Sequence, residues 1–185
     1  PIARTTALTR HMYDTAILIG RFEPVHTGHL ALLNRALEEA GKVIIIVGSA
    51  FQARSPKNPF TWKERADMLL GSLGDADRAR VDVVPVRDYY DEARWVHAVQ
   101  QAVSERTQPG SRIGLVGHFK DASSSYLSSF PGWELIPLAR QGEIDATMIR
   151  NAYFGATAKT IPIALSPFHD VLPKSTRTLL ERFAT

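Results

Sequence analysis

The sequence contains no cysteine, no long apolar run and little net charge. Without cysteine the chain can form neither disulfides nor thiolate metal sites, which is typical of a reducing cytoplasm, where we expect the protein to act. No apolar run approaches the roughly 20 residues that a membrane-spanning helix needs, so the sequence predicts no membrane partner. A formal charge of +3 suits an anionic small ligand but is too small to indicate nucleic-acid binding.

The composition is that of an ordinary globular protein with one domain. The 185 residues are 44% hydrophobic and 22% charged, which allows one sizeable core. Before Asp14 the chain carries Arg4 and Arg10 but no acidic residue. We expect residues 1–14 to form a flexible tail, although a targeting peptide has a similar composition. Residues 15–185 are then expected to form the domain.

Short apolar runs alternate along the chain with segments of helical periodicity. Runs of Val, Ile and Leu without polar alternation predict strands that are buried on both faces, and their alternation with helices predicts a parallel sheet. We therefore expect an α/β fold with five or six parallel strands and helices on both faces of the sheet. Strands are expected over 16–20, 42–48, 81–86, 112–117 and 133–138; helices over 27–39, 61–73, 92–106, 121–129, from near 145, and over 174–183; and an edge strand or extended connector over 161–167.

Three of the expected strands end in a glycine, at Gly20, Gly48 and Gly117. Ligands of parallel sheets bind beyond the carboxyl ends of the strands. The loops that follow these glycines are therefore expected to share one cleft.

The segment GRFEPVHTGH at residues 20–29 is the most informative stretch of the chain. It joins an expected strand to an expected helix, and the start of a helix attracts anions. His26 and His29 are three residues apart, so both can lie on one face of that helix, and Gly28 lets a phosphate approach the backbone. Neither a P-loop nor a GxGxxG motif is present. A polyphosphate is the expected ligand; the alternative is that the histidines only cap or pack the helix.

Motifs along most of the chain resemble those of the HxGH nucleotidyltransferases, and among these the archaeal-type nicotinamide-nucleotide adenylyltransferases. The resemblance implies a Rossmann-like fold and, since bacterial relatives of this type often carry one, a Nudix hydrolase domain that follows this domain in a longer polypeptide. A solitary transferase is equally compatible with the sequence, and so is a homo-oligomer. The motifs lie at 20–29, at 48–50 with 58–61 and 64–65, at 87–88 with 95–96, at 117–121 and at 144–150.

The same resemblance implies adenylyl transfer from ATP to the 5′-phosphate of nicotinamide mononucleotide, which yields NAD and pyrophosphate by direct in-line attack. Such a step needs alignment and charge stabilisation more than acid–base chemistry. The implied cofactor is Mg²⁺, which enters with ATP and is held mainly by phosphates and water, without an all-protein metal site. The implied ATP-binding residues are Gly20, Arg21, Phe22, His26, His29, Gly117, Thr147 and Arg150, of which Arg21, His26, His29 and Arg150 are the catalytic ones.

Four residues are implied to bind the acceptor mononucleotide: Lys57, Asn58, Asp88 and Trp95. Lys57 is expected at the phosphate, or else as a solvated loop residue. Trp95 is expected to stack on the cationic pyridine ring, or else to pack in the core. Asp88 pairs with the carboxamide, pairs with Arg21, or caps the next helix.

One position departs from the family pattern. Asp145 stands where the family motif usually has serine. Aspartate caps a helix equally well, but its charge repels phosphate unless magnesium or a basic neighbour intervenes. Two other functions remain open from the sequence: adenylyl or cytidylyl transfer to another phosphate acceptor, and nucleotide sensing without turnover.

Overall fold

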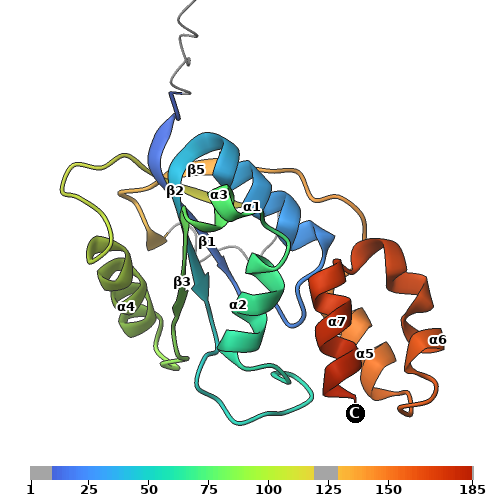
Figure 1. Cartoon of the computed structure of the whole chain (residues 1–185). Helices are drawn as coiled ribbons and strands as arrows, with labels where there is room; N and C mark the ends of the chain where they lie inside the picture. The colour runs from blue at the N-terminus through green and yellow to red at the C-terminus, as the bar shows by residue number, and fades with distance from the viewer. Residues whose placement is uncertain (1–9, 119–128, 185) are drawn as a thin grey trace, which may run out of the picture.

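A five-stranded sheet forms the centre of the protein, with the strand order β3-β2-β1-β4-β5 (Figure 1). The computed structural model describes residues 10–118 and 129–184. All neighbouring strands are parallel, which confirms the predicted α/β fold. The strands are β1 (Tyr13–Gly20), β2 (Ala40–Val47), β3 (Val81–Pro85), β4 (Ile113–Gly117) and β5 (Glu134–Pro137).

Most helices lie where the sequence predicts them. The first and the last predicted helix have the observed bounds, whereas those expected over 61–73 and 92–106 end two or three residues earlier, and the short α3 is not predicted. The helices are α1 (Thr27–Glu39), α2 (Trp62–Leu70), α3 (Asp75–Arg78), α4 (Glu92–Ser104), α5 (Ala146–Phe154), α6 (Ile161–Leu165), the 3-10 helix η2 (Ser166–Val171) and α7 (Lys174–Phe183).

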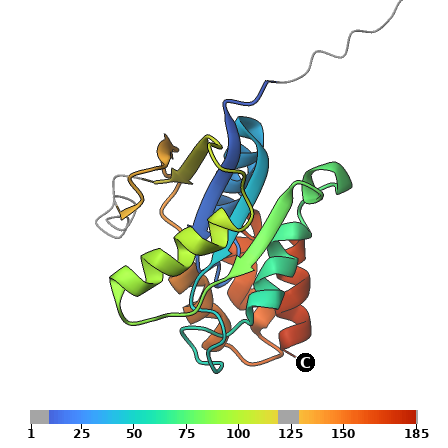
Figure 2. The ribbon, with the colours of Figure 1, turned by 90° about the vertical axis from the view of Figure 1, so that its left-hand side faces the viewer.

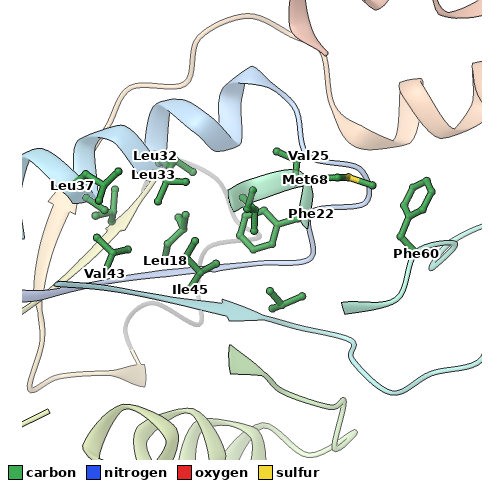
Figure 3. Packing of buried hydrophobic residues seen from close by; sticks show 14 of the residues in the cluster. Leu18, Phe22, Val25, Leu32, Leu33, Leu37, Val43, Ile45, Phe60 and Met68 are labelled. Carbon is green, nitrogen blue, oxygen red and sulfur yellow. The ribbon is translucent and has the colours of Figure 1, made fainter. Parts of the chain in front are cut away.

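The sheet is buried between two layers of helices. Successive residues of a strand point to opposite faces of the sheet, so each central strand packs against both layers. Val43 and Ile45 of β2 pack toward α1 and its Leu33 (Figure 3). Ile44 and Ile46 belong to a second cluster, which includes α4. Figures 1 and 2 show α4 on the face of the sheet opposite to α1 and α2. The prediction of helices on both faces is therefore confirmed.

The C-terminal part of the chain is helical, so the strand or connector expected over 161–167 is wrong. Residues 161–165 form α6, which packs against α5, and η2 follows directly. All five residues of α6 are apolar or proline, so this short segment shows no helical period. Pro162 lies in the first turn, where a helix does not need its N–H.

Two predicted segments lie partly or wholly outside the described residues. Nearly all of the helix expected over 121–129 belongs to the undescribed stretch 119–128, and residues 1–9 of the expected tail are also outside. The end of that tail is ordered, because β1 begins at Tyr13; the domain boundary itself stays a prediction. Across residues 10–118 and 129–184 no helix is long and apolar enough to cross a membrane.

Candidate active site

His26 and His29 stand at the start of α1, just beyond the loop that follows β1. His26 is the N-cap of α1, and its Nδ1 accepts a hydrogen bond from the Gly28 N–H at 3.1 Å. The His26 N–H donates to Nδ1 of His29 at 3.2 Å, which completes a reciprocal cap. The rings stack with their centroids 3.8 Å apart. The structure thus brings both imidazoles together, as the spacing of three residues predicts.

Both imidazoles are neutral at physiological pH. Burial lowers the pKa of His26 from 6.5 to about 4. Burial, and next the neighbouring His26, lower the pKa of His29 well below 6.5. Since Nδ1 of each ring accepts a backbone hydrogen bond, the single proton of each neutral ring lies on Nε2. The pair therefore offers two Nε2–H donors, which suit phosphate oxygens, and no positive charge.

Two glycines and a buried aromatic ring fix this geometry. A Cβ on Gly28 would lie 2.8 Å from the His26 ring, and a Cβ on Gly20 would lie 2.8 Å from the Phe22 ring. Phe22 is 2% exposed, and its ring meets His29 edge-on, with centroids 4.9 Å apart. The side chain of Phe22, expected as an ATP contact, thus lies in the core and supports His29.

Arg150 and Thr147, both expected to bind ATP, lie on α5 and are hydrogen-bonded to each other. Arg150 donates to Thr147 Oγ1 at 3.2 Å and to the backbone carbonyl of Glu23 at 2.7 Å. The second bond joins α5 to the loop after β1. Burial, and next the positive charge of Arg21, lower the pKa of Arg150. Two neighbouring guanidiniums of this kind favour an anion between them.

A buried ion pair holds the backbone beneath the site. Arg65 and Glu23 are each 1% exposed, and Arg65 Nη1 lies 3.3 Å from Glu23 Oε1. The Arg65 guanidinium also donates to the carbonyls of Arg21 at 2.7 Å, Gly48 at 2.8 Å and Ser49 at 3.3 Å. It thereby ties the loop after β1 to the loop after β2. Sequence reasoning missed this role, because the partners are backbone groups far away in the chain.

A cavity of about 610 Å³ opens beyond the ends of β1 and β2, next to the start of α4. Gly20 and Gly48 both line it, so two of the three predicted strand-end loops share this cleft. Gly117 does not line it, and His118, which follows Gly117, lines a different cavity. Trp95 lines the cavity and packs edge-on against Phe130, with centroids 6.0 Å apart. Half-buried Trp95 therefore both supports the core and presents a surface to the cavity. Arg21 reaches the same cavity.

Asp88 also lines this cavity, and the structure rules out two of its three expected roles. It does not cap the next helix, because Asp91 is the N-cap of α4. Within the described chain it does not bond Arg21 directly either, since the side chains of Gln52 and Asn58 lie between them. Pairing with a carboxamide stays a prediction.

Lys57 and Asn58 lie in the loop between β2 and α2, beside Arg21. Arg21 Nη2 donates to the Lys57 carbonyl at 2.6 Å and to the side-chain oxygen of Asn58. The structure thus places these two residues, which are expected to bind the acceptor, next to an expected phosphate contact. Lys57 is exposed, so its two alternative roles both stay predictions.

A second cavity, of about 230 Å³, is lined by both histidines of α1 together with His118 and Asp145. His118 Nδ1 lies 2.6 Å from the Leu138 carbonyl, which orients the ring. His118 lines this cavity but is absent from the sequence-based set of site residues; Gly117, which that set includes, ends β4 directly before it. In the sequence, His118 could have been found by its position directly after the glycine that ends an expected strand.

Asp145 caps α5 as expected, since its Oδ1 accepts a hydrogen bond from the Met148 N–H at 2.9 Å. Its negative charge raises the pKa of His26, against the larger lowering by burial. Arg140 lines the same cavity, so this cavity holds a basic side chain as well as Asp145.

Comparisons with known proteins agree with this geometry. A family model described as cytidylyltransferase-like matches residues 17–152. The nicotinamide/nicotinic acid mononucleotide adenylyltransferase of Acinetobacter baylyi is 41% identical over 145 residues, covering 78% of this chain and 77% of that protein. The nicotinamide-nucleotide adenylyltransferase of Pyrococcus abyssi is 32% identical over 162 residues, covering 86% and 78%.

A solved structure is similar over most of the chain. It is a bifunctional NMN adenylyltransferase/ADP ribose pyrophosphatase from Francisella tularensis, complexed with AMP and a manganese ion, with a TM-score of 0.70 and 32% identity. The match covers 91% of this chain but 52% of that one, so the chain spans about half of the bifunctional protein. From the fold, the site and these relatives, the chain belongs to the nicotinamide-nucleotide adenylyltransferase family, within the cytidylyltransferase-like proteins.

Proposed function

We propose that this protein transfers the adenylyl group of ATP to the 5′-phosphate of nicotinamide mononucleotide, forming NAD and pyrophosphate. One observation carries the proposal: two neutral imidazoles stack at the start of α1, and the loop that leads to them from β1 carries Arg21, which lines a cavity together with Trp95. The names of the relatives from Acinetobacter and Pyrococcus support the same activity.

In the proposed reaction, an oxygen of the mononucleotide phosphate attacks the α-phosphorus of ATP. The new P–O bond forms while the bond from the α-phosphorus to the α,β-bridging oxygen breaks, and the electron pair leaves with pyrophosphate. No protein nucleophile takes part, and no proton has to move to a side chain. Alignment of the substrates and stabilisation of the developing charge are therefore the work of the protein.

The histidines and arginines have separate roles in this proposal. The Nε2–H groups of His26 and His29 donate to oxygens of the ATP phosphates. The guanidiniums of Arg21 and Arg150 bind the departing β- and γ-phosphates, for which their planar forks are suited. Thr147 adds a hydroxyl beside Arg150.

The remaining nucleotide contacts follow from the strand ends. Gly20 and Gly117 end β1 and β4, and they contact ATP through their backbone groups. Phe22 acts through its support of the His29 ring.

The acceptor is placed in the cavity of about 610 Å³. Its pyridinium ring stacks on Trp95, since a cation gains about 1 kcal/mol or more over an indole face. Lys57 and Asn58 bind its phosphate, and Asp88 accepts a hydrogen bond from its carboxamide.

We propose Mg²⁺ as the ion that accompanies ATP. In the described parts of the chain no group of three or more His, Cys, Asp or Glu side chains is placed to hold a metal ion. Magnesium keeps several waters and binds substrate phosphates readily. The ion can therefore enter bound to ATP, without a set of protein ligands of its own. The Francisella relative was crystallised with AMP and manganese, which supports a divalent ion.

One assay tests the function against its alternatives. The protein is incubated with ATP and magnesium, and with nicotinamide mononucleotide, phosphopantetheine or no acceptor, while pyrophosphate and NAD are measured. We expect both products with nicotinamide mononucleotide alone. Pyrophosphate with another acceptor would indicate a different transferase, and tight nucleotide binding without any product would indicate a sensing module.

Three further points stay predictions. They are a cytoplasmic location, a homo-oligomeric state, and a Nudix hydrolase domain after this one in a longer polypeptide. The bifunctional name of the Francisella relative supports the last point. Cell fractionation, light scattering and an ADP-ribose hydrolysis assay of the native protein test them in turn.

A further inference from the structure

A chain of side-chain hydrogen bonds connects the acceptor cavity with the guanidinium of Arg21. Arg21 Nη2 donates to Asn58 Oδ1. Asn58 Nδ2 donates to Gln52 Oε1 at 2.8 Å. Gln52 Nε2 donates to a carboxylate oxygen of Asp88, which lines the cavity. The chain therefore runs from a cation through two amides to an anion, with every donor pointing in the same direction.

The direction of this chain depends on the two amides together. An amide has one donor end and one acceptor end, so turning either amide over would break the bonds on both of its sides. Chains of aligned hydrogen bonds polarise and strengthen each other, and they do so more strongly when water is excluded. An acceptor seated over Asp88 excludes water from one end of the chain.

Gln52 is the link that has no second anchor among these contacts. The Asn58 N–H also donates to Ser55 Oγ at 3.1 Å, and the Asp88 carboxylate also accepts from Ser49 Oγ at 3.0 Å. Among residues 10–118 and 129–184, the Gln52 side chain makes only the hydrogen bonds to Asn58 and Asp88, and the residue is exposed. Truncation of Gln52 therefore removes the connection without disturbing the core.

The Arg21 end of this series of hydrogen bonds affects phosphate binding. Both side-chain hydrogen bonds of Arg21 use Nη2. Its Nε is buried and has no hydrogen-bond partner among the described residues. Holding Nη2 toward Asn58 thus fixes the plane of the guanidinium and the direction of its remaining N–H groups.

We propose that Gln52 is a positioning residue that couples the binding of the two substrates, an inference that rests on the proposed function. When the mononucleotide covers Asp88, the hydrogen-bonded chain tightens and holds the Arg21 guanidinium in the orientation that binds ATP. Coupling between two sites is reciprocal, so bound ATP also improves the binding of the mononucleotide. Gln52 touches neither substrate and acts through Asn58 and Asp88.

The test uses an ATP analogue with a methylene bridge between its α- and β-phosphates, which binds but cannot react. Its dissociation constant is measured by calorimetry with and without saturating nicotinamide mononucleotide. We expect the mononucleotide to tighten binding of the analogue to the wild-type protein by about fivefold or more. In Gln52→Leu we expect this factor to fall to about 1, while each ligand alone binds within about twofold of wild type.

Gln101→Leu is the matched control. Gln101 is also exposed, and its Nε2 donates to Glu105 Oε1 at 3.1 Å on α4. We expect this variant to keep the wild-type coupling. Equal coupling in Gln52→Leu and wild type, no coupling in wild type, or the same loss in Gln101→Leu would each overturn the inference. Failure of the wild-type protein to form NAD would instead overturn the proposed function.

Discussion

At the scale of single residues, the histidines are held by one nitrogen and are expected to work with the other. Nδ1 of His29 accepts the His26 N–H, which leaves Nε2–H for a phosphate. We expect His29→Ala to lower kcat about 100- to 1000-fold, as the loss of one such donor does in comparable sites. The melting temperature should change little, because alanine is a good helix former.

Steady-state kinetics and thermal unfolding of the same preparation check this prediction. A variant with unchanged kcat would refute the assigned role. A loss of activity that merely follows a loss of folded protein would point to the capping bond instead.

Trp95 offers a test of the acceptor site. We expect Trp95→Ala to raise KM for nicotinamide mononucleotide about tenfold, because the pyridinium loses an indole face worth on the order of 1 kcal/mol or more. KM for ATP should stay within about twofold. Equal increases for both substrates would show that Trp95 serves mainly to pack against Phe130.

The low pKa of His26 makes stability depend on pH. The imidazole has a pKa of 6.5 in the unfolded chain and of about 4 in the folded protein. Between these values the unfolded chain binds more protons, so its free energy falls relative to the folded state as the pH falls. The stabilisation is complete above pH 6.5 and is lost as the pH decreases toward 4.

Thermal unfolding between pH 7.5 and 5 checks this expectation. The melting temperature of the wild type should fall more steeply with acidification than that of His26→Gln, which has no imidazole at this position. Parallel curves for the two proteins would contradict it.

At the scale of elements, the Arg65–Glu23 pair joins two strand ends to α2. Arg65 is 1% exposed and also donates to three loop carbonyls. We expect Arg65→Met to destabilise the fold by about 3–5 kcal/mol, because the buried carboxylate of Glu23 loses its partner. Urea unfolding measures this cost.

The double variant Arg65→Met/Glu23→Leu separates the charge from the geometry. It removes both buried charges, so we expect it to recover part of the lost stability but not the activity, since the loop carbonyls stay unbound. Full recovery of activity would show that the pair does not position the site.

Also at this scale, the elements differ in how far the sequence predicts them. The central strands are unbroken apolar runs, and α1 has clear periodicity between His26 and Ala40, so their ends are nearly right. The prediction for residues 161–167 is wrong because five apolar or proline residues are compatible with a strand, a connector or a short helix. Residues 161–165 are helical in the structure, where they pack against α5.

The site is likewise predictable only in part. The stacked histidines follow from a spacing of three on one helix. Arg65 and Gln52 could not be found in this way, because their partners are set by loops that meet only in the folded chain.

At the scale of the whole molecule, the C-terminal helices support the loop that leads from β1 to His26. Thr176 of α7 is fully buried, and its hydroxyl donates to the Val25 carbonyl at 2.9 Å, directly before His26. We expect Thr176→Val to cost about 1–3 kcal/mol of stability, because that carbonyl is left unpaired. Denaturant unfolding gives the value.

Tyr153→Phe is the control for Thr176→Val. It removes another buried hydrogen bond, from Tyr153 to the Leu180 carbonyl at 2.7 Å, within the C-terminal helices. At a temperature where both variants are folded, Thr176→Val should lower kcat more than Tyr153→Phe does. Equal kcat values would show that α7 stabilises the fold without shaping the site.

The burial that keeps both imidazoles uncharged also bears on reversibility. No side chain of the proposed site changes its protonation state during transfer, so nothing has to be reset after a turnover. Since forward and reverse reactions share one transition state, the same groups would assist pyrophosphate in cleaving NAD back to ATP and mononucleotide. The net direction of flux would then be governed by how quickly pyrophosphate is removed, not by the protein.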